Sequence, residues 1–133
     1  MTDANTTHST PLSPLQGKVA LITGAGQGIG QGIAFSLAKR GVSIVAVGRT
    51  LSKCEKTVAD IEARFNGKAV AIECDISNLD ALDALVADAV AAFGRLDILV
   101  NNAVTTSINT LMDTTLEDFE KGLRVGPMAT LRL

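Results

Sequence analysis

A glycine-rich turn near the N-terminus is the segment of this chain best suited to holding a charged ligand. Residues 18–30 have the sequence KVALITGAGQGIG, an apolar segment followed by a turn with glycines at positions 24, 28 and 30. Glycine lets a chain turn sharply and lets its backbone approach a diphosphate closely. A helix that begins near Gly28 would direct its N–H groups and positive dipole end at the same diphosphate. The spacing G-x-x-x-G-x-G therefore predicts a phosphate-binding turn, and the alternative interpretation is an ordinary loop between a strand and a helix.

An acidic residue and a pair of amides follow two later apolar segments. Asp75 comes after the segment at residues 69–72, and Asn101 and Asn102 come after the segment at residues 96–100. Asp75 is also a residue type that commonly ends a strand in a turn. The two amides would alternatively satisfy backbone groups inside a loop. The residue types do not decide between a structural role and a role in binding for either Asp75 or the amide pair.

The segments that would position these residues alternate between strands and helices. The predicted strands cover residues 19–23, 42–47, 69–72 and 96–100, and the predicted helices cover residues 28–40 and 51–65, a segment after Ser77, and a segment from Leu116. Ser77 with Asp80, and Thr115 with Asp118, have the spacing of helix capping boxes. Strands that are apolar throughout, alternating with amphipathic helices, predict an α/β fold with a parallel sheet covered on both faces.

Length and composition indicate one globular domain. The chain has 133 residues, of which 47% are hydrophobic and 20% are charged, and this length allows a modest core. Residues 1–16 contain prolines and small polar residues and are expected to form a flexible N-terminal tail, which leaves residues 17–133 for the domain. The net charge is -2, and the basic residues are scattered. We therefore expect no nucleic acid and no membrane as partners.

The N-terminus and the cysteines indicate a cytoplasmic protein. The first residues lack the basic and apolar regions of a secretory signal. Cys54 and Cys74 form no C-x-x-C pair, so we expect two reduced thiols. His8 is the single histidine and has no clustered partners, so no metal site is expected.

Three segments, in this order, resemble the short-chain dehydrogenase/reductase family. Residues 23–30 (TGAGQGIG) resemble its T-G-x-x-x-G-I-G signature, residues 74–76 (CDI) resemble its acidic contact after the third strand, and residues 97–103 (DILVNNA) resemble its D-x-L-V-N-N-A-G segment. The resemblance implies a Rossmann-type doubly wound parallel sheet with strand order 3-2-1-4, of which this chain would form an incomplete, NAD(P)-binding domain. It also implies hydride transfer between a nicotinamide cofactor and a carbonyl or alcohol.

The resemblance further implies which residues contact the cofactor. Those of the glycine turn would line its phosphates and ribose, namely Gly24, Gly26, Gln27, Gly28, Ile29 and Gly30. Asp75 and Ile76 would flank the adenine. Asn102 and Ala103 would hold the adenosine side at the tip of the fourth strand.

The end of the second strand favours NADP over NAD. An NAD site places a carboxylate there to bond the ribose hydroxyls. Gly48 stands at that position, and Arg49 follows with a guanidinium suited to a 2′-phosphate. The alternative interpretation is that Arg49 is a solvated turn residue. Gln27 weakens the prediction of NADP, because many NADP-preferring relatives carry a second basic residue in the glycine turn.

The chain departs from the family pattern at three places. Val104 stands where the family has a glycine, so the loop after Ala103 is expected to follow a different path. Gly126 stands where the family has an asparagine, and Pro127 beside it predicts a helix break, because proline lacks an N–H. The composition includes no tyrosine, whereas the family's proton donor is a tyrosine paired with a lysine. The sequence therefore offers no candidate catalytic residues.

Three hypotheses follow from this combination. In the first, the chain is the NADP-binding portion of a longer oxidoreductase and is inactive alone, with the residues that shape the substrate pocket beyond Leu133. In the second it is a short nucleotide-binding protein without catalysis, and in the third it is a non-functional truncated remnant. In the order 3-2-1-4, the strand at residues 96–100 would lack a neighbour on one side, and its unpaired N–H and C=O groups would favour self-association.

Overall fold

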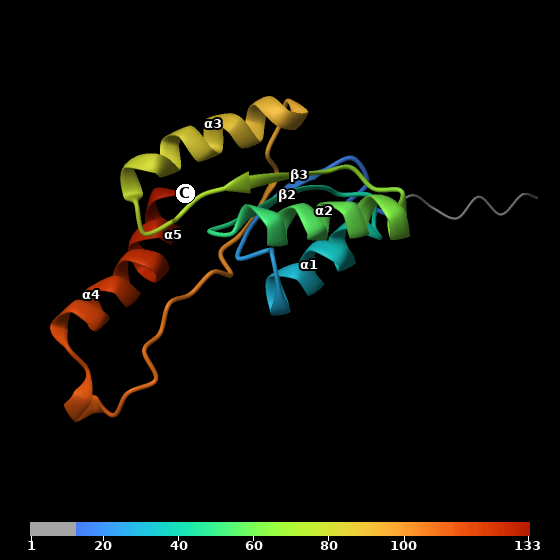
Figure 1. The fold of residues 1–133 in the computed structure, drawn as a ribbon. Coiled ribbons are helices and arrows are strands. Elements are labelled where there is room, and N and C mark those ends of the chain that lie inside the picture. The colour runs from blue at the N-terminus through green and yellow to red at the C-terminus, as the bar shows by residue number, and fades with distance from the viewer. Residues whose placement is uncertain (1–12) are drawn as a thin grey trace, which may run out of the picture.

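The computed structural model describes residues 13–133, which form a parallel sheet with helices on both faces (Figure 1). The first half of the fold comprises β1 (Val19–Thr23), α1 (Gly28–Ala38), β2 (Ser43–Gly48), α2 (Leu51–Phe65) and β3 (Ala69–Glu73). The second half comprises η1 (Leu79–Ala81), α3 (Leu82–Phe93), β4 (Ile98–Val100), η2 (Leu111–Asp113), α4 (Leu116–Leu123), η3 (Arg124–Met128) and α5 (Ala129–Arg132).

The strand order is β3-β2-β1-β4 and all neighbours are parallel, which confirms the predicted topology. β4 is shorter than the predicted strand at residues 96–100. The Asp97 carboxylate accepts the Val19 N–H at 2.9 Å and the Asp97 N–H donates to the Val19 carbonyl at 3.0 Å, and the paired residues of β4 run from Ile98 to Val100. β4 forms an edge of the described sheet. Self-association through this edge stays a prediction.

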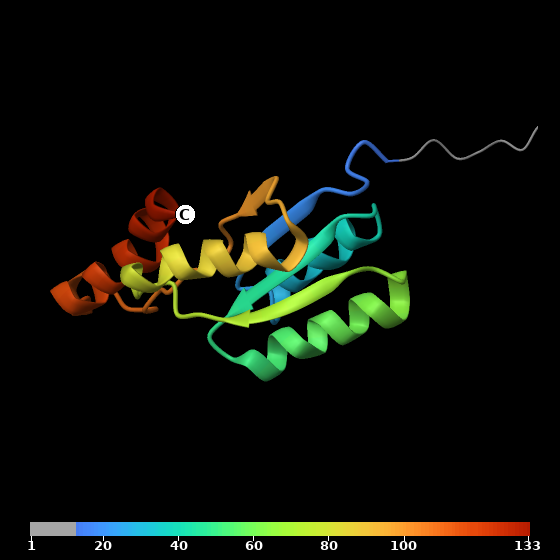
Figure 2. The ribbon, with the colours of Figure 1, turned by 90° about the horizontal axis from the view of Figure 1, so that it is seen from above.

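The two faces of the sheet bury alternate residues of the central strands. Ala20 and Ile22 pack with residues of α1 and α2 on one face. Leu21 and Val45 pack with residues of α3 and of the helical segment from Val125 on the other. Figure 2 shows α3 lying over the strands, with the last helical segment close to its first turn, where Arg132 pairs with Asp83. This arrangement covers the sheet while leaving the carboxyl ends of its strands accessible.

The predicted helix start at Ser77 is wrong. The Ser77 hydroxyl and N–H both donate to Asp75 Oδ1, at 2.8 and 3.0 Å, so the side chain closes a turn instead of capping a helix. A 3₁₀ turn at η1 follows, and α3 begins at Leu82. The capping box of Thr115 and Asp118 at the start of α4 is present as predicted.

The predicted interruption of the α-helix near Gly126 and Pro127 is present, but it is a π-helical turn between α4 and α5 and does not end the helix. The chain remains helical but widens into a π-helical turn at η3, in which the Ala129 N–H donates to the Arg124 carbonyl. A proline inside a regular α-helix clashes with the carbonyl four residues earlier and leaves a hydrogen bond unmade. The wider π turn accommodates Pro127 without ending the helix. Val125 remains buried in this turn.

Much of the predicted tail, residues 1–12, lies outside the described residues. Residues 13–16 form a turn in which the Gln16 N–H donates to the Ser13 carbonyl at 2.9 Å, and Leu15 packs against the core. Among residues 13–133, no helix is both long enough and apolar enough to cross a bilayer. Within the same range, no group of three His, Cys, Asp or Glu side chains could hold a metal ion.

Candidate functional site

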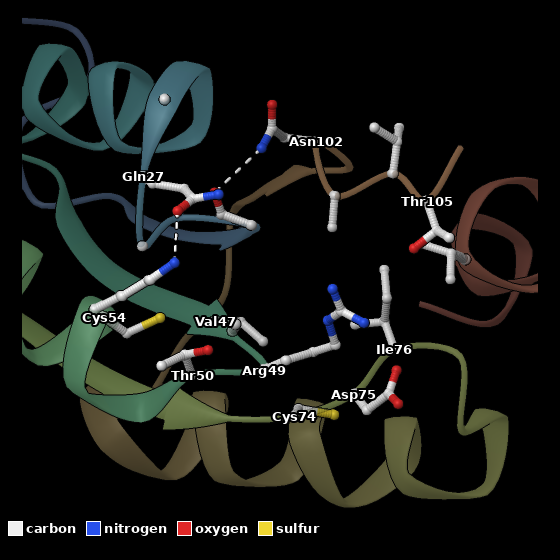
Figure 3. A pocket seen from close by; sticks show the side chains of 18 of the residues that line it. Gln27, Val47, Arg49, Thr50, Cys54, Cys74, Asp75, Ile76, Asn102 and Thr105 are labelled. Carbon is white, nitrogen blue, oxygen red and sulfur yellow. Dashed lines mark hydrogen bonds between the residues drawn. The ribbon is translucent and has the colours of Figure 1, made fainter. Parts of the chain in front are cut away.

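A pocket of about 380 Å³ lies at the carboxyl ends of the strands (Figure 3). Its wall includes every predicted site residue except Gly30. The residues that line it are Gly24, Gly26, Gln27, Gly28, Ile29, Val47, Gly48, Arg49, Thr50, Lys53, Cys54, Cys74, Asp75, Ile76, Asn102, Ala103, Val104, Thr105 and Val125. These segments follow the strands of the sheet, and they meet because the carboxyl ends of parallel strands all lie at the same edge of the sheet.

The glycine turn needs its glycines for conformation and for close packing. Gly24 and Gly28 have φ angles of +67° and +57°, a region that side chains disfavour. A Cβ on Gly30 would lie 2.2 Å from the Gly24 carbonyl oxygen and 2.5 Å from Asn102 Nδ2. Gly30 is therefore buried under the turn and lets α1 approach it. α1 begins at Gly28, so its first N–H groups face the pocket without intrahelical partners.

Asn102 fastens the loop after β4 to the glycine turn. Its side-chain amide donates to the Thr23 carbonyl at 3.0 Å and to the Gly24 carbonyl at 3.3 Å. The amide thus bonds two backbone carbonyls, as the alternative interpretation of the Asn101–Asn102 pair expected. Figure 3 shows the Asn102 side chain directed toward the turn. The amide holds the two walls of this end of the pocket together.

The Thr23 hydroxyl joins the same two segments. It accepts the N–H groups of Asn102 and Ala103, at 3.1 and 3.0 Å, and donates to the Val100 carbonyl at 3.4 Å. Thr23 is 1% exposed, so water cannot replace these bonds easily. The sequence reasoning did not single out Thr23 for this role.

Asp75 lies on the opposite wall, at the end of β3. A hydrogen bond from the Ser77 hydroxyl holds the pKa of Asp75 below its ordinary value, and the positive charges of Arg49 and Lys121 act in the same direction. Asp75 is therefore an anion at neutral pH. It is a hydrogen-bond acceptor at the rim of the pocket.

A side chain at the tip of β2 would crowd a buried thiol. A Cβ on Gly48 would lie 2.9 Å from Cys54 Sγ, and Cys54 is fully buried. A carboxylate at position 48 would require this buried thiol to move. Arg49 follows Gly48 and is exposed at the pocket (Figure 3). The tip of β2 thus presents a guanidinium and no carboxylate.

Both cysteines line the pocket as free thiols. Burial raises the pKa of Cys54 and of Cys74, and the Asp75 charge raises the pKa of Cys74 further. Both are neutral at neutral pH and poor nucleophiles. This agrees with the expectation of two reduced thiols.

Lys53 is a pocket residue that the sequence reasoning missed. It lies in the first turn of α2, and its ammonium donates to Gln27 Oε1 at 2.8 Å. Arg49 precedes α2, which begins at Leu51, so the spacing of Arg49 and Lys53 gave no helical signal for this contact. Thr50, Val104, Thr105 and Val125 also line the pocket without having been assigned to it.

Comparison with known proteins identifies the family. A family model for short chain dehydrogenases matches residues 18–133. The hydroxynaphthalene reductase arp2 of Aspergillus fumigatus is 40% identical over 119 residues, which cover 89% of this chain and 43% of that protein.

Two solved structures share the fold at comparable identity. The L-sorbose reductase of Gluconobacter frateurii, complexed with NADPH and L-sorbose, matches with a TM-score of 0.86 and 34% identity over 92% of this chain and 46% of that chain. A short chain dehydrogenase of Mycobacterium paratuberculosis, bound to NAD, matches with a TM-score of 0.80 and 35% identity over 89% of this chain and 48% of that chain. This chain thus spans less than half the length of these relatives. Since the family model matches nearly all of the described residues, the chain belongs to the short-chain dehydrogenase family.

Proposed function

We propose that this chain forms the NADP-binding portion of an oxidoreductase that transfers hydride between NADP(H) and a carbonyl or alcohol. The glycine turn and the first turn of α1 would hold the diphosphate. Asp75 and Ile76 would flank the adenine, and Asn102 and Ala103 would hold the adenosine side of the cofactor. Gly24, Gly26 and Gly28 line the pocket, and their lack of side chains supports this placement, because it leaves the backbone of the turn open to a ligand.

The observation that carries the choice of NADP is the tip of β2. Gly48 carries no carboxylate and a side chain there would crowd the buried Cys54 thiol, and Arg49 supplies a guanidinium beside it. A carboxylate at this position would bond the ribose hydroxyls of NAD and repel a 2′-phosphate. The relatives do not decide the matter, since one was solved with NADPH and another with NAD. The local residues therefore support NADP.

Replacing Arg49 with alanine should reduce the preference for NADPH over NADH by about 1–3 kcal/mol, the scale of a hydrogen bond to a charged group. The affinity for NADH should change little, because NADH has no 2′-phosphate. Calorimetric titration of both cofactors into the unmutated and variant chains measures the difference.

The matched control is Arg40→Ala. Arg40 is exposed beyond the last residue of α1, where it bonds Ser36, and it does not line the pocket. We expect this variant to keep the full preference. Equal affinities for NADPH and NADH in the unmutated chain would contradict the proposal of NADP, and no affinity for either would contradict the binding site itself.

A further inference from the structure

The first turn of α2 is packed against the glycine turn, and this packing places Lys53. A Cβ on Gly26 would lie 2.8 Å from the Cβ of Lys53, so the two backbones are nearly in contact. One turn further along α2, the buried Thr57 hydroxyl donates to the Ala25 carbonyl at 3.0 Å. The base of the Lys53 side chain is thus fixed beside the glycine turn.

The Lys53 ammonium is held by a neutral acceptor. It donates to Gln27 Oε1 at 2.8 Å, a hydrogen bond that ends on the labelled Gln27 in Figure 3. An ammonium has three donors, so two remain for a ligand. Because the glutamine amide is uncharged, it orients the ammonium without neutralising it.

The surroundings of Lys53 favour an anion. The ion pairs within residues 13–133 are Lys56–Asp60, Arg95–Asp97 and Arg132–Asp83, so neither Arg49 nor Lys53 has a carboxylate partner there. α2 has 15 residues and no acidic residue in its first turn, so the positive end of its dipole adds to the same field. Arg49 and Lys53 precede and follow the start of α2, and both line the pocket.

We propose that Lys53 is a second determinant of cofactor specificity, which binds the 2′-phosphate of NADP together with Arg49 and is positioned by Gln27. This inference rests on the proposed function, since it assigns a further residue to the same site. Lys53 supplies, from α2, the second basic group that the glycine turn itself lacks. Gln27 is not basic and therefore weakens the prediction of NADP when the glycine turn is considered alone. In this arrangement it contributes to NADP binding by orienting the Lys53 ammonium.

The test compares Lys53→Gln with Lys56→Gln in the full chain. Both lysines are exposed on α2, but Lys56 pairs with Asp60 and does not line the pocket. NADPH and NADH are titrated into each variant by calorimetry, and circular dichroism verifies the fold. Lys53→Gln should weaken NADPH binding about tenfold, or about 1.4 kcal/mol, and leave NADH binding unchanged. Lys56→Gln should change neither affinity, and Lys53→Arg should restore most of the NADPH affinity.

A double-mutant cycle tests the positioning role of Gln27. Gln27→Met should weaken NADPH binding when Lys53 is present, and should have a smaller effect on NADPH in the Lys53→Gln background. Equal effects of Lys53→Gln and Lys56→Gln on a chain that prefers NADPH would overturn this inference and leave the proposed function standing. Failure of the unmutated chain to bind either cofactor would overturn both.

Discussion

Replacing Gly30 with alanine is expected to destabilise the domain and to weaken dinucleotide binding at least about tenfold. The new Cβ would lie 2.2 Å from the Gly24 carbonyl oxygen and 2.5 Å from the Asn102 amide nitrogen, so backbone atoms must move. Overpacking of this kind costs about 1–3 kcal/mol of stability. Binding should fall as well, because the turn displaced by the Cβ is the one proposed to hold the diphosphate. Denaturant unfolding and calorimetric titration measure the two effects.

Gly32→Ala is the matched control for this prediction. Gly32 lies in the same helix, and a Cβ there would meet nothing within 4 Å. Alanine is a better helix former than glycine by about 1 kcal/mol, so this variant should be slightly more stable and should bind normally. If Gly30→Ala behaved like Gly32→Ala, the close packing of α1 under the turn would be wrong.

Replacing Thr23 with valine is expected to cost about 1–3 kcal/mol of unfolding free energy. Valine keeps the shape of the side chain but removes the oxygen that accepts the N–H groups of Asn102 and Ala103. The Ala103 N–H would be left without its acceptor, which costs about 1–3 kcal/mol, whereas the Asn102 N–H keeps the Val100 carbonyl at 3.1 Å. The loop after β4 should also loosen, so cofactor affinity should fall in parallel. Denaturant unfolding gives the stability, and amide hydrogen exchange at Asn102 and Ala103 reports the loop.

Thr23→Ser distinguishes the effect of losing the hydroxyl from the effect of losing the methyl group. Serine retains the oxygen and loses one methyl group, for which about 0.8 kcal/mol is the expected cost. Its amide protection at Asn102 and Ala103 should stay close to that of the unmutated chain. Comparable losses in Thr23→Ser and Thr23→Val would show that the hydroxyl is not the link between β1 and the loop.

The sequence predicted the sheet and much of the pocket because both follow from local patterns. β1 and β2 consist mostly of buried apolar residues, as expected of strands covered on both faces, and each is followed by an amphipathic or glycine-led helix. The carboxyl ends of parallel strands meet at one edge, so residues that follow the strands meet there as well. Arg49, Asp75 and Asn102 are all such residues, and each lines the pocket.

Features that depend on contacts between distant segments could not be predicted in this way. Lys53 is a pocket residue because α2 packs on the glycine turn, and no pattern within α2 records that contact. The Thr23 hydroxyl bonds groups about eighty residues away, as its sequence separations of 79 and 80 show. The spacing of Ser77 and Asp80 indicated a capping box, but the nearer Asp75 carboxylate accepts the Ser77 backbone N–H that the Asp80 carboxylate would accept in such a box.

The pocket is proposed to bind NADP with its 2′-phosphate at the tip of β2, and a crystal structure of the chain with NADP⁺ tests this binding mode most directly. We predict the diphosphate against the turn at residues 24–30 and the 2′-phosphate within hydrogen-bonding distance of the Arg49 guanidinium. Electron density for the cofactor elsewhere on the molecule, or for an adenosine ribose directed away from Arg49, would contradict the account.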